Sequence, residues 1–273
     1  MKIIRVFPRK TKATPDDYLS RVACPPMIGD EADQVHISVS FTYDIPIAER
    51  LAILWQQVAP VSMGGPALDD TGKEFIPGMY VKHGYVMTSR GCPNQCWFCS
   101  VWRREGRTIR ELPITEGYNL LDSNILACSD EHIKAVFSML AAGKKKFHKP
   151  IEFTGGLEAA RLKEWHAVEL RKLRPKQLFF AYDTPDDLEP LHMAGKILKD
   201  AGCAIGHILR CYVLCGWKGD SIPSAEKRMR ETIQAGFMPM AMLYRDKKGV
   251  RDQEWKKWAR TWIRPEIISS KGL

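Results

Sequence analysis

The regular alternation of strand-like and helix-like segments between Gly84 and Tyr244 constrains the fold of this chain most strongly. Six short apolar segments predict strands, at residues 84–89, 118–127, 151–156, 177–183, 207–216 and 238–244. Helical spacing of apolar residues predicts helices between them, at residues 130–142, 157–173, 186–201 and 222–235. We expect Ser129 to cap the first of these helices and Gly143 to end it. This order predicts an α/β fold with parallel strands and right-handed crossovers, with fewer units than the eight of a closed barrel.

A smaller α/β pattern precedes this region. Residues 35–41 predict a strand, residues 47–58 a helix with Pro46 in its first turn, and residues 60–67 a second strand that runs into a glycine turn. Residues 2–7 predict a further strand, and the Gly-, Pro- and charge-rich stretch 69–80 predicts a linker or covering loop. We therefore divide the chain into a short Rossmann-like extension with its linker (1–83), a main α/β region (84–245) and a C-terminal helix and tail (246–273). Three tryptophans of that helix, Trp255, Trp258 and Trp262, are expected to pack.

Composition narrows the location and the partners. No apolar run approaches the roughly 20 residues of a membrane helix, so we expect no membrane span. The N-terminus lacks the apolar core and cleavage site of a secretory signal, and we expect the protein in the cytoplasm. The net charge of +9 keeps nucleic acid open as a partner, with basic residues concentrated at 102–110 and 144–149. Neither stretch carries an interleaved aromatic pattern for base stacking.

Three cysteines, Cys92, Cys96 and Cys99, follow the first strand of the main region at the spacing C-x3-C-x2-C. Clustered cysteines in an intracellular protein indicate metal binding or catalysis more often than disulfides. A structural zinc ion needs a fourth ligand, which Cys128 or His83 could supply. An iron–sulfur cubane on three cysteines instead leaves one iron open for a substrate or cosubstrate. Three cysteines that serve only for packing are hard to reconcile with a glycine-containing loop, so we favour the cluster.

The motif, with the aromatic Phe98 before its last cysteine, resembles the signature of the radical S-adenosylmethionine superfamily. The resemblance implies a partial (β/α)6 TIM-like barrel and a 4Fe–4S cluster whose open iron chelates the amino and carboxylate groups of S-adenosylmethionine. Reductive cleavage then yields a 5′-deoxyadenosyl radical that abstracts hydrogen from a substrate. It also implies an electron donor such as flavodoxin or ferredoxin. Because no separate substrate domain follows residue 245, we favour a small-molecule substrate, with a partner that closes the barrel mouth as the alternative, and no catalytic residue is assigned.

The same resemblance suggests residues that contact the cosubstrate. Gly155 and Gly156 lie in "FTGG", which is similar to the glycine-pair motif that holds the amino group. That motif ends in Glu directly after the glycines, whereas here Leu157 precedes Glu158, so we do not transfer the role to Glu158. The full set of expected cofactor contacts is Phe98, Asp122, Asn124, Gly155, Gly156, Tyr182 and Arg210, with Asp183 as a further strand-end candidate.

The N-terminal pattern also resembles the cobalamin-associated branch of the superfamily. It spans under ninety residues and lacks the D-x-H-x-x-G histidine motif, so we interpret it as a structural cap and expect no cobalamin. Two other classes stay open: a zinc- or cluster-stabilised nucleic-acid-binding protein, and an electron-transfer protein. A second cluster on Cys203, Cys211 and Cys215 is disfavoured, because Cys211 and Cys215 would lie about 13 Å apart along one strand face. Cys128 or Cys215 could instead serve as a hydrogen donor to the substrate.

Overall fold

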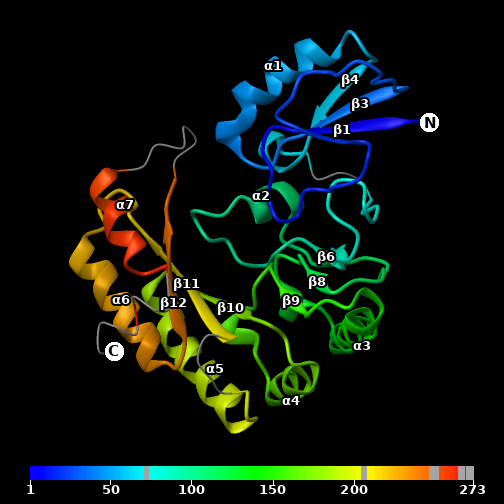
Figure 1. Ribbon diagram of the computed structural model, residues 1–273. Helices are drawn as coiled ribbons and strands as arrows, with labels where there is room; N and C mark the ends of the chain where they lie inside the picture. The colour runs from blue at the N-terminus through cyan, green and yellow to red at the C-terminus, as the bar shows by residue number, and fades with distance from the viewer. Residues whose placement is uncertain (71–73, 204–207, 246–251, 264–267, 269–273) are drawn as a thin grey trace.

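The computed structural model describes residues 1–70, 74–203, 208–245, 252–263 and 268. Its parallel strands form a small N-terminal unit and a larger main region, with helix α2 (Val101–Glu105) between them in Figure 1. Buried apolar side chains form two separate clusters, one in each part. His207, at the start of the fifth expected strand, and most of the tail beyond Ile263 lie outside the described residues.

The N-terminal unit is a four-stranded parallel sheet covered by one helix. Its strands are β1 (Ile3–Phe7), β2 (Ser20–Val22), β3 (Gln34–Ser38) and β4 (Val61–Gly64), in the order β2-β1-β3-β4. Helix α1 (Ile45–Trp55) packs its buried Leu51 and Trp55 on one face. The expected strand–helix–strand unit is confirmed, although α1 ends three residues before the predicted Val58 and β2 was not predicted.

The linker covers the other face of this sheet. The buried Arg5 of β1 donates hydrogen bonds to the carbonyl oxygens of Gly78 and Met79, at 3.0 and 3.1 Å. On β3, Nδ1 of His36 lies 2.7 Å from the Tyr80 hydroxyl. These polar contacts replace the second layer of helices that usually covers a parallel sheet.

The main region contains the six expected strands, all parallel and paired in chain order. They are β5 (Tyr85–Val86), β8 (Asn119–Leu120), β9 (Glu152–Phe153), β10 (Leu178–Tyr182), β11 (Leu209–Cys215) and β12 (Met238–Leu243). They form the sheets β5-β8-β9 and β10-β11-β12, and a parallel bridge between Glu152 and Gln177 joins one sheet to the other. The α/β class with parallel strands is therefore confirmed.

Four helices connect these strands and lie outside them in Figure 1. They are α3 (Asp130–Phe147), α4 (Glu164–Leu173), α5 (Leu188–Asp200) and α6 (Ile222–Gln234). Ser129 caps α3 as expected, because its side chain accepts a hydrogen bond from the His132 amide at 3.2 Å.

Three local predictions were wrong. Helix α3 does not end at Gly143 but continues through it to Phe147. The glycine is needed for close packing instead, because a Cβ there would lie 1.8 Å from the Gly117 carbonyl oxygen. The strand predicted at 118–127 stops at Leu120. The helix predicted from Leu157 begins only at Glu164, since Leu157 itself is buried in the core and a short 3-10 turn intervenes.

The expected C-terminal helix is α7 (Gln253–Arg260), and two of the three predicted tryptophans contact α6. The indole nitrogens of Trp258 and Trp262 both donate to Glu226 of α6, at 3.1 and 2.9 Å, and Trp262 is fully buried. Among the described helices, none has the length and apolar character needed to span a bilayer.

Candidate functional site

The three cysteines lie on a loop that is clamped at both ends. Strand β6 (Ser89–Arg90) leads into the loop and pairs antiparallel with β7 (Arg110–Glu111) beyond it. The Cys92 amide donates to the Gly106 carbonyl oxygen at 3.2 Å, and the Cys99 amide donates to Cys96 at 3.1 Å. Gly91 has φ +92°, and a Cβ there would lie 2.4 Å from the Thr108 carbonyl oxygen. The turn into the loop therefore requires glycine.

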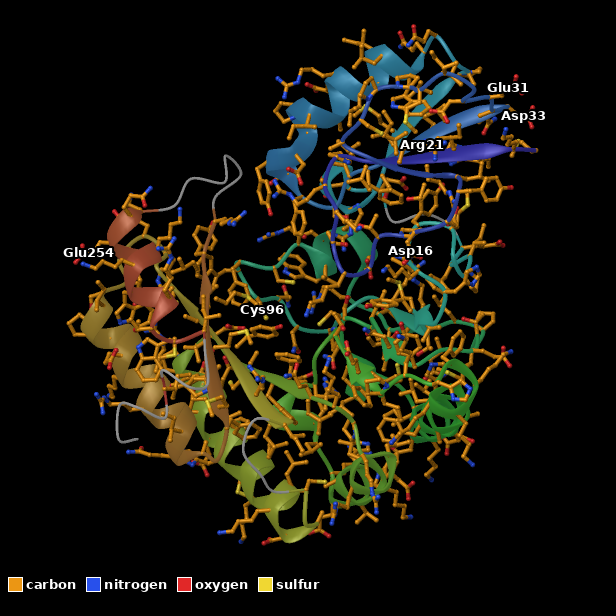
Figure 2. All side chains as sticks on the ribbon, in the orientation of Figure 1. Asp16, Arg21, Glu31, Asp33, Cys96 and Glu254 are labelled. Atoms are coloured by element: carbon orange, nitrogen blue, oxygen red, sulfur yellow. The ribbon has the colours of Figure 1, made fainter. Side chains whose placement is uncertain are left out.

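The loop forms one wall of a cavity of about 290 Å³ at the carboxyl ends of the parallel strands. Figure 2 shows Cys96 near the middle of the molecule, between the N-terminal unit and strands β10–β12. Seven of the ten residues expected at the site line this cavity: Cys92, Cys96, Phe98, Cys99, Asn124, Gly155 and Gly156. We call it the cysteine cavity. Its place agrees with the rule that α/β folds bind ligands beyond the carboxyl ends of their strands.

Burial makes the thiol groups of Cys96 and Cys99 hard to ionise without a metal. It raises the pKa of Cys96 to about 11, with a further contribution from the neighbouring Cys99 and Cys92. It also raises the pKa of Cys99. Thiolate is the form that binds metal, so metal binding here would release protons. Within the described residues, no three His, Cys, Asp or Glu side chains meet in an arrangement that could hold a single metal ion.

Two acceptors line the cavity beside the cysteines. The Asn124 side-chain amide donates to Glu158 Oε2 at 2.5 Å and approaches Cys92 Sγ at 3.7 Å. Its own carbonyl oxygen, Oδ1, is buried and has no hydrogen-bond partner among the described residues. A buried acceptor without a donor costs free energy, and a ligand that carries N–H groups would remove that cost. The Asn124 oxygen and the Glu158 carboxylate together suit an ammonium group.

Glu158 reaches this cavity although Leu157 separates it from the glycine pair. The Leu157 side chain is buried in the core and its amide donates to the Phe179 carbonyl oxygen at 2.7 Å. The extra residue is thus absorbed by packing, and Glu158 follows it into the cavity wall, where Arg161 also pairs with it at 2.7 Å.

The glycine pair allows close approach of neighbouring strand ends. A Cβ on Gly155 would lie 1.9 Å from the Asp122 carbonyl oxygen, so only glycine fits. Gly156 has φ +87°, a conformation that favours glycine. Both residues therefore expose backbone rather than side chain to the cavity.

A pair of carboxylates, Asp183 and Asp187, lies on the far wall of the cysteine cavity. Burial, followed by the charge of Asp187, raises the pKa of Asp183 to about 7. Asp187 accepts hydrogen bonds from the amides of Asp183 and Thr184, at 2.9 and 2.7 Å, and so fixes the turn after β10. The sequence marked Asp183 as a strand-end candidate but missed Asp187, whose spacing from Thr184 is typical of a helix cap.

Three expected contacts do not line the cysteine cavity. Asp122 is buried and accepts hydrogen bonds from the Thr88 amide, the Thr88 hydroxyl and the Ser89 hydroxyl, at 2.6 to 2.7 Å, so it braces the strand that enters the cysteine loop. The Tyr182 hydroxyl donates to Glu231 of α6 at 2.7 Å, on the helix side of the sheet. Arg210 lies near the amino end of β11, where the Gln177 amide oxygen accepts from its guanidinium at 3.2 Å.

An aromatic contact that the sequence did not predict connects the loop to the last two strands. The Trp97 ring lies 6.2 Å from Trp217, which follows β11, and 5.5 Å from Tyr244, which follows β12. The sequence gave no signal for this contact, because it joins residues more than a hundred positions apart.

The other cysteines lie elsewhere. Cys211 and Cys215 are fully buried on the same face of β11, as expected, and the Cys215 thiol donates to the Met242 carbonyl oxygen at 3.6 Å. Cys203 donates to the Ala167 carbonyl oxygen at 3.2 Å. Burial raises the pKa of Cys128 to about 11. None of these four lines the cysteine cavity.

No protein-family model matches the chain, and a search of the curated proteins finds no relative.

Proposed function

We propose that the protein is a radical S-adenosylmethionine enzyme. The observation that carries the proposal is the composition of a single cavity: three loop cysteines, a glycine pair and the acceptors Asn124 and Glu158. These groups come from three consecutive strand ends, and all of them line one cavity of about 290 Å³. The donor set fits a cluster held by three thiolates together with a cosubstrate that carries an ammonium group.

In this proposal Cys92, Cys96 and Cys99 hold a 4Fe–4S cluster. When bound, such a cluster supplies the electron that cleaves the sulfonium of S-adenosylmethionine to methionine and a 5′-deoxyadenosyl radical. Asn124 and Glu158 accept hydrogen bonds from the cosubstrate's ammonium, and the exposed backbone of the glycine pair lets it approach closely. The strand ends also exclude water from a reactive radical.

We further propose that the six parallel strands curve into a partial (β/α)6 TIM-like barrel. Support comes from the order β5-β8-β9 and β10-β11-β12 with the bridge between them. Further support comes from Trp97, because a loop that follows the first strands contacts residues that follow the last two. In a flat six-stranded sheet the first strand would lie four spacings from β11 and five from β12, roughly 19 and 24 Å.

The proposal is tested by anaerobic reconstitution of the full chain with iron and sulfide. Dithionite replaces a protein reductant such as flavodoxin or ferredoxin, and 5′-deoxyadenosine is measured by chromatography after S-adenosylmethionine is added. We expect product from the native chain and none from Cys96→Ala. The matched control is Cys24→Ala, since Cys24 lies in the N-terminal unit and its contact with Trp55 is made by its carbonyl oxygen, which the substitution keeps.

A protein that binds zinc, carries no iron and fails to bind S-adenosylmethionine would overturn the proposal. A loaded cluster that is redox-active but never cleaves S-adenosylmethionine, with or without added small molecules, would instead identify an electron carrier.

Nucleic-acid binding is a second candidate, favoured by a basic groove between α3 and α4. Six basic side chains line it beside one acidic residue, Glu169; they are Lys134, Lys144, Lys145, Arg171, Lys172 and Arg174. We expect any such binding to weaken steeply with salt. Fluorescence anisotropy with a labelled RNA at several salt concentrations measures it, and Lys144→Glu with Lys145→Glu should abolish it.

A further inference from the structure

A second cavity, of about 390 Å³, lies between the N-terminal unit and the main region. One wall is the N-terminal sheet, with Ser38 and Gly64 at the carboxyl ends of β3 and β4 and Ser62 within β4. The opposite wall comes from the first strands of the main region, with Met87, Leu121 and Ser123. We call it the anion cavity, for the reasons that follow. Its volume is within the range of small-molecule sites.

Two arginines with one carboxylate between them form the cationic wall of this cavity. Arg104 Nη2 lies 3.0 Å and Arg90 Nη1 lies 3.5 Å from the same oxygen of Glu105. The other Glu105 oxygen accepts from the Gly91 amide at 3.2 Å. All three side chains are about nine-tenths buried, with exposed fractions of 11, 10 and 5% for Arg90, Arg104 and Glu105. The two desolvated guanidinium groups therefore share the Glu105 carboxylate.

Each arginine has one nitrogen donor without a hydrogen-bond partner among the described residues. Nε of Arg90 and Nε of Arg104 are buried and have no hydrogen-bond partner within the described part of the chain. The charge of the buried Asp122 also acts on Arg90, and the Asp122 oxygens accept hydrogen bonds from Thr88 and Ser89. Both arginines line the cavity, and a guanidinium in a cavity wall favours an oxyanion, which it can bind through two hydrogen bonds.

The sheet edge opposite supplies small polar groups. Ser38 and Ser40 lie at this edge and Ser62 lies within β4, and the turn after β4 passes through Gly65, whose φ is +110°. A Cβ on Gly65 would lie 2.8 Å from the Val39 carbonyl oxygen, so the turn needs glycine to close against β3. Ligands bind at such edges in α/β sheets. Asp70 and Glu74 form an exposed acidic rim, where solvent screens their charge.

The anion cavity adjoins the cysteine cavity. Ser123 lines both, and it lies one residue before Asn124, which holds Glu158. A molecule in the anion cavity would thus lie beside the place where the proposed cosubstrate binds.

We propose that the anion cavity binds a small organic anion, a carboxylate or a phosphate ester, whose charged group is held by Arg90 and Arg104, and that this anion is the substrate. The second part rests on the proposed radical function; the binding itself does not. The N-terminal unit then has a role beyond covering the main region, because its serine-lined edge completes the substrate site.

Thermal unfolding of the reconstituted full chain tests the binding. A ligand that binds only the folded state raises Tm as its concentration increases. Potassium phosphate and potassium acetate, up to about 50 mM at ionic strength held constant with chloride, serve as probes for the two anion classes. We expect a saturable rise in Tm with one of them, which identifies the class.

Two variants locate the effect. Ser62→Trp fills the cavity from the N-terminal sheet, away from the cysteine loop, and should abolish the rise. Arg104→Gln should weaken the apparent affinity about tenfold by removing one charge-assisted contact. The matched control is Ile53→Trp, on the exposed side of α1, which should behave as the native chain.

The outcomes separate the two claims. No saturable rise with either anion, or an equal rise in Ser62→Trp, overturns the anion site even if 5′-deoxyadenosine is formed. A rise that both variants reduce, in a protein that never cleaves S-adenosylmethionine, supports the anion site and overturns its role as the substrate site of a radical enzyme.

Discussion

The Asn124 side-chain amide donates a hydrogen bond of 2.5 Å to Glu158 across 34 positions of sequence. The bond joins the loops that follow β8 and β9 and places one unused amide oxygen and one carboxylate beside Cys92. Both acceptors are available only because neighbouring parallel strands end at the same edge.

Replacing Glu158 with glutamine should weaken cosubstrate binding. The amide keeps an acceptor for Asn124 but removes the charge that faces an ammonium group. We expect the Kd for S-adenosylmethionine to rise about tenfold, equivalent to about 1.4 kcal/mol, with cluster absorbance unchanged. Equilibrium dialysis measures the Kd. Glu169→Gln, a partly exposed glutamate paired with Lys172 on α4, should have no effect. Unchanged affinity in Glu158→Gln would show that this carboxylate does not contact the cosubstrate.

Asp183 should make the stability of the metal-free chain depend on pH. Its pKa is about 7 in the folded state against an ordinary value of 3.8, so the folded chain binds more protons than the unfolded chain between these values. The free energy of unfolding should therefore fall as pH rises from about 4 to 7. Asp183→Asn cannot ionise and should be more stable at about pH 8, by a few kcal/mol at most.

Urea denaturation of the two proteins at several pH values measures this effect. Asp200→Asn, at an exposed site near the end of α5, is the control and should keep the native pH dependence. If Asp183→Asn kept it as well, the Asp183 carboxyl would not be the group responsible.

Asp122 should stabilise the fold rather than bind the cosubstrate. Asp122→Ala leaves three donors of Thr88 and Ser89 without their acceptor, in a fully buried place. We expect a loss of about 2–4 kcal/mol in the free energy of unfolding. Chemical denaturation checks it. Native-like stability combined with weaker S-adenosylmethionine binding would return Asp122 to the set of cosubstrate contacts.

Trp97 should hold the cysteine loop against the ends of β11 and β12. Trp97→Ala removes the ring contacts with Trp217 and Tyr244, and we expect the reconstituted cluster to be lost several-fold faster in air. Decay of the iron–sulfur absorbance measures the rate. Trp97→Phe keeps an aromatic ring, so its decay rate should lie between those of the native chain and Trp97→Ala. Equal decay rates in all three proteins would mean that the contact does not protect the loop.

Periodicity and spacing in the sequence determined the order of the elements. Six strand segments and their connecting helices follow from local apolar patterns, and parallel pairing follows from the alternation itself. The capping of α3 by Ser129 and the grouping of Cys92, Cys96 and Cys99 are also local, because each involves residues within eight positions of one another.

The tertiary structure alone decided which polar side chains face a cavity. Asp122 and Asn124 are two residues apart and were equal candidates, yet one braces Thr88 while the other lines the cysteine cavity. Gly143 is of the residue type that commonly ends a helix, but here it allows close packing against Gly117. The buried triad of Arg90, Glu105 and Arg104 gave no sequence signal. Sequence periodicity specifies the face of an element, whereas the partners of a buried charge depend on which distant backbone packs against it.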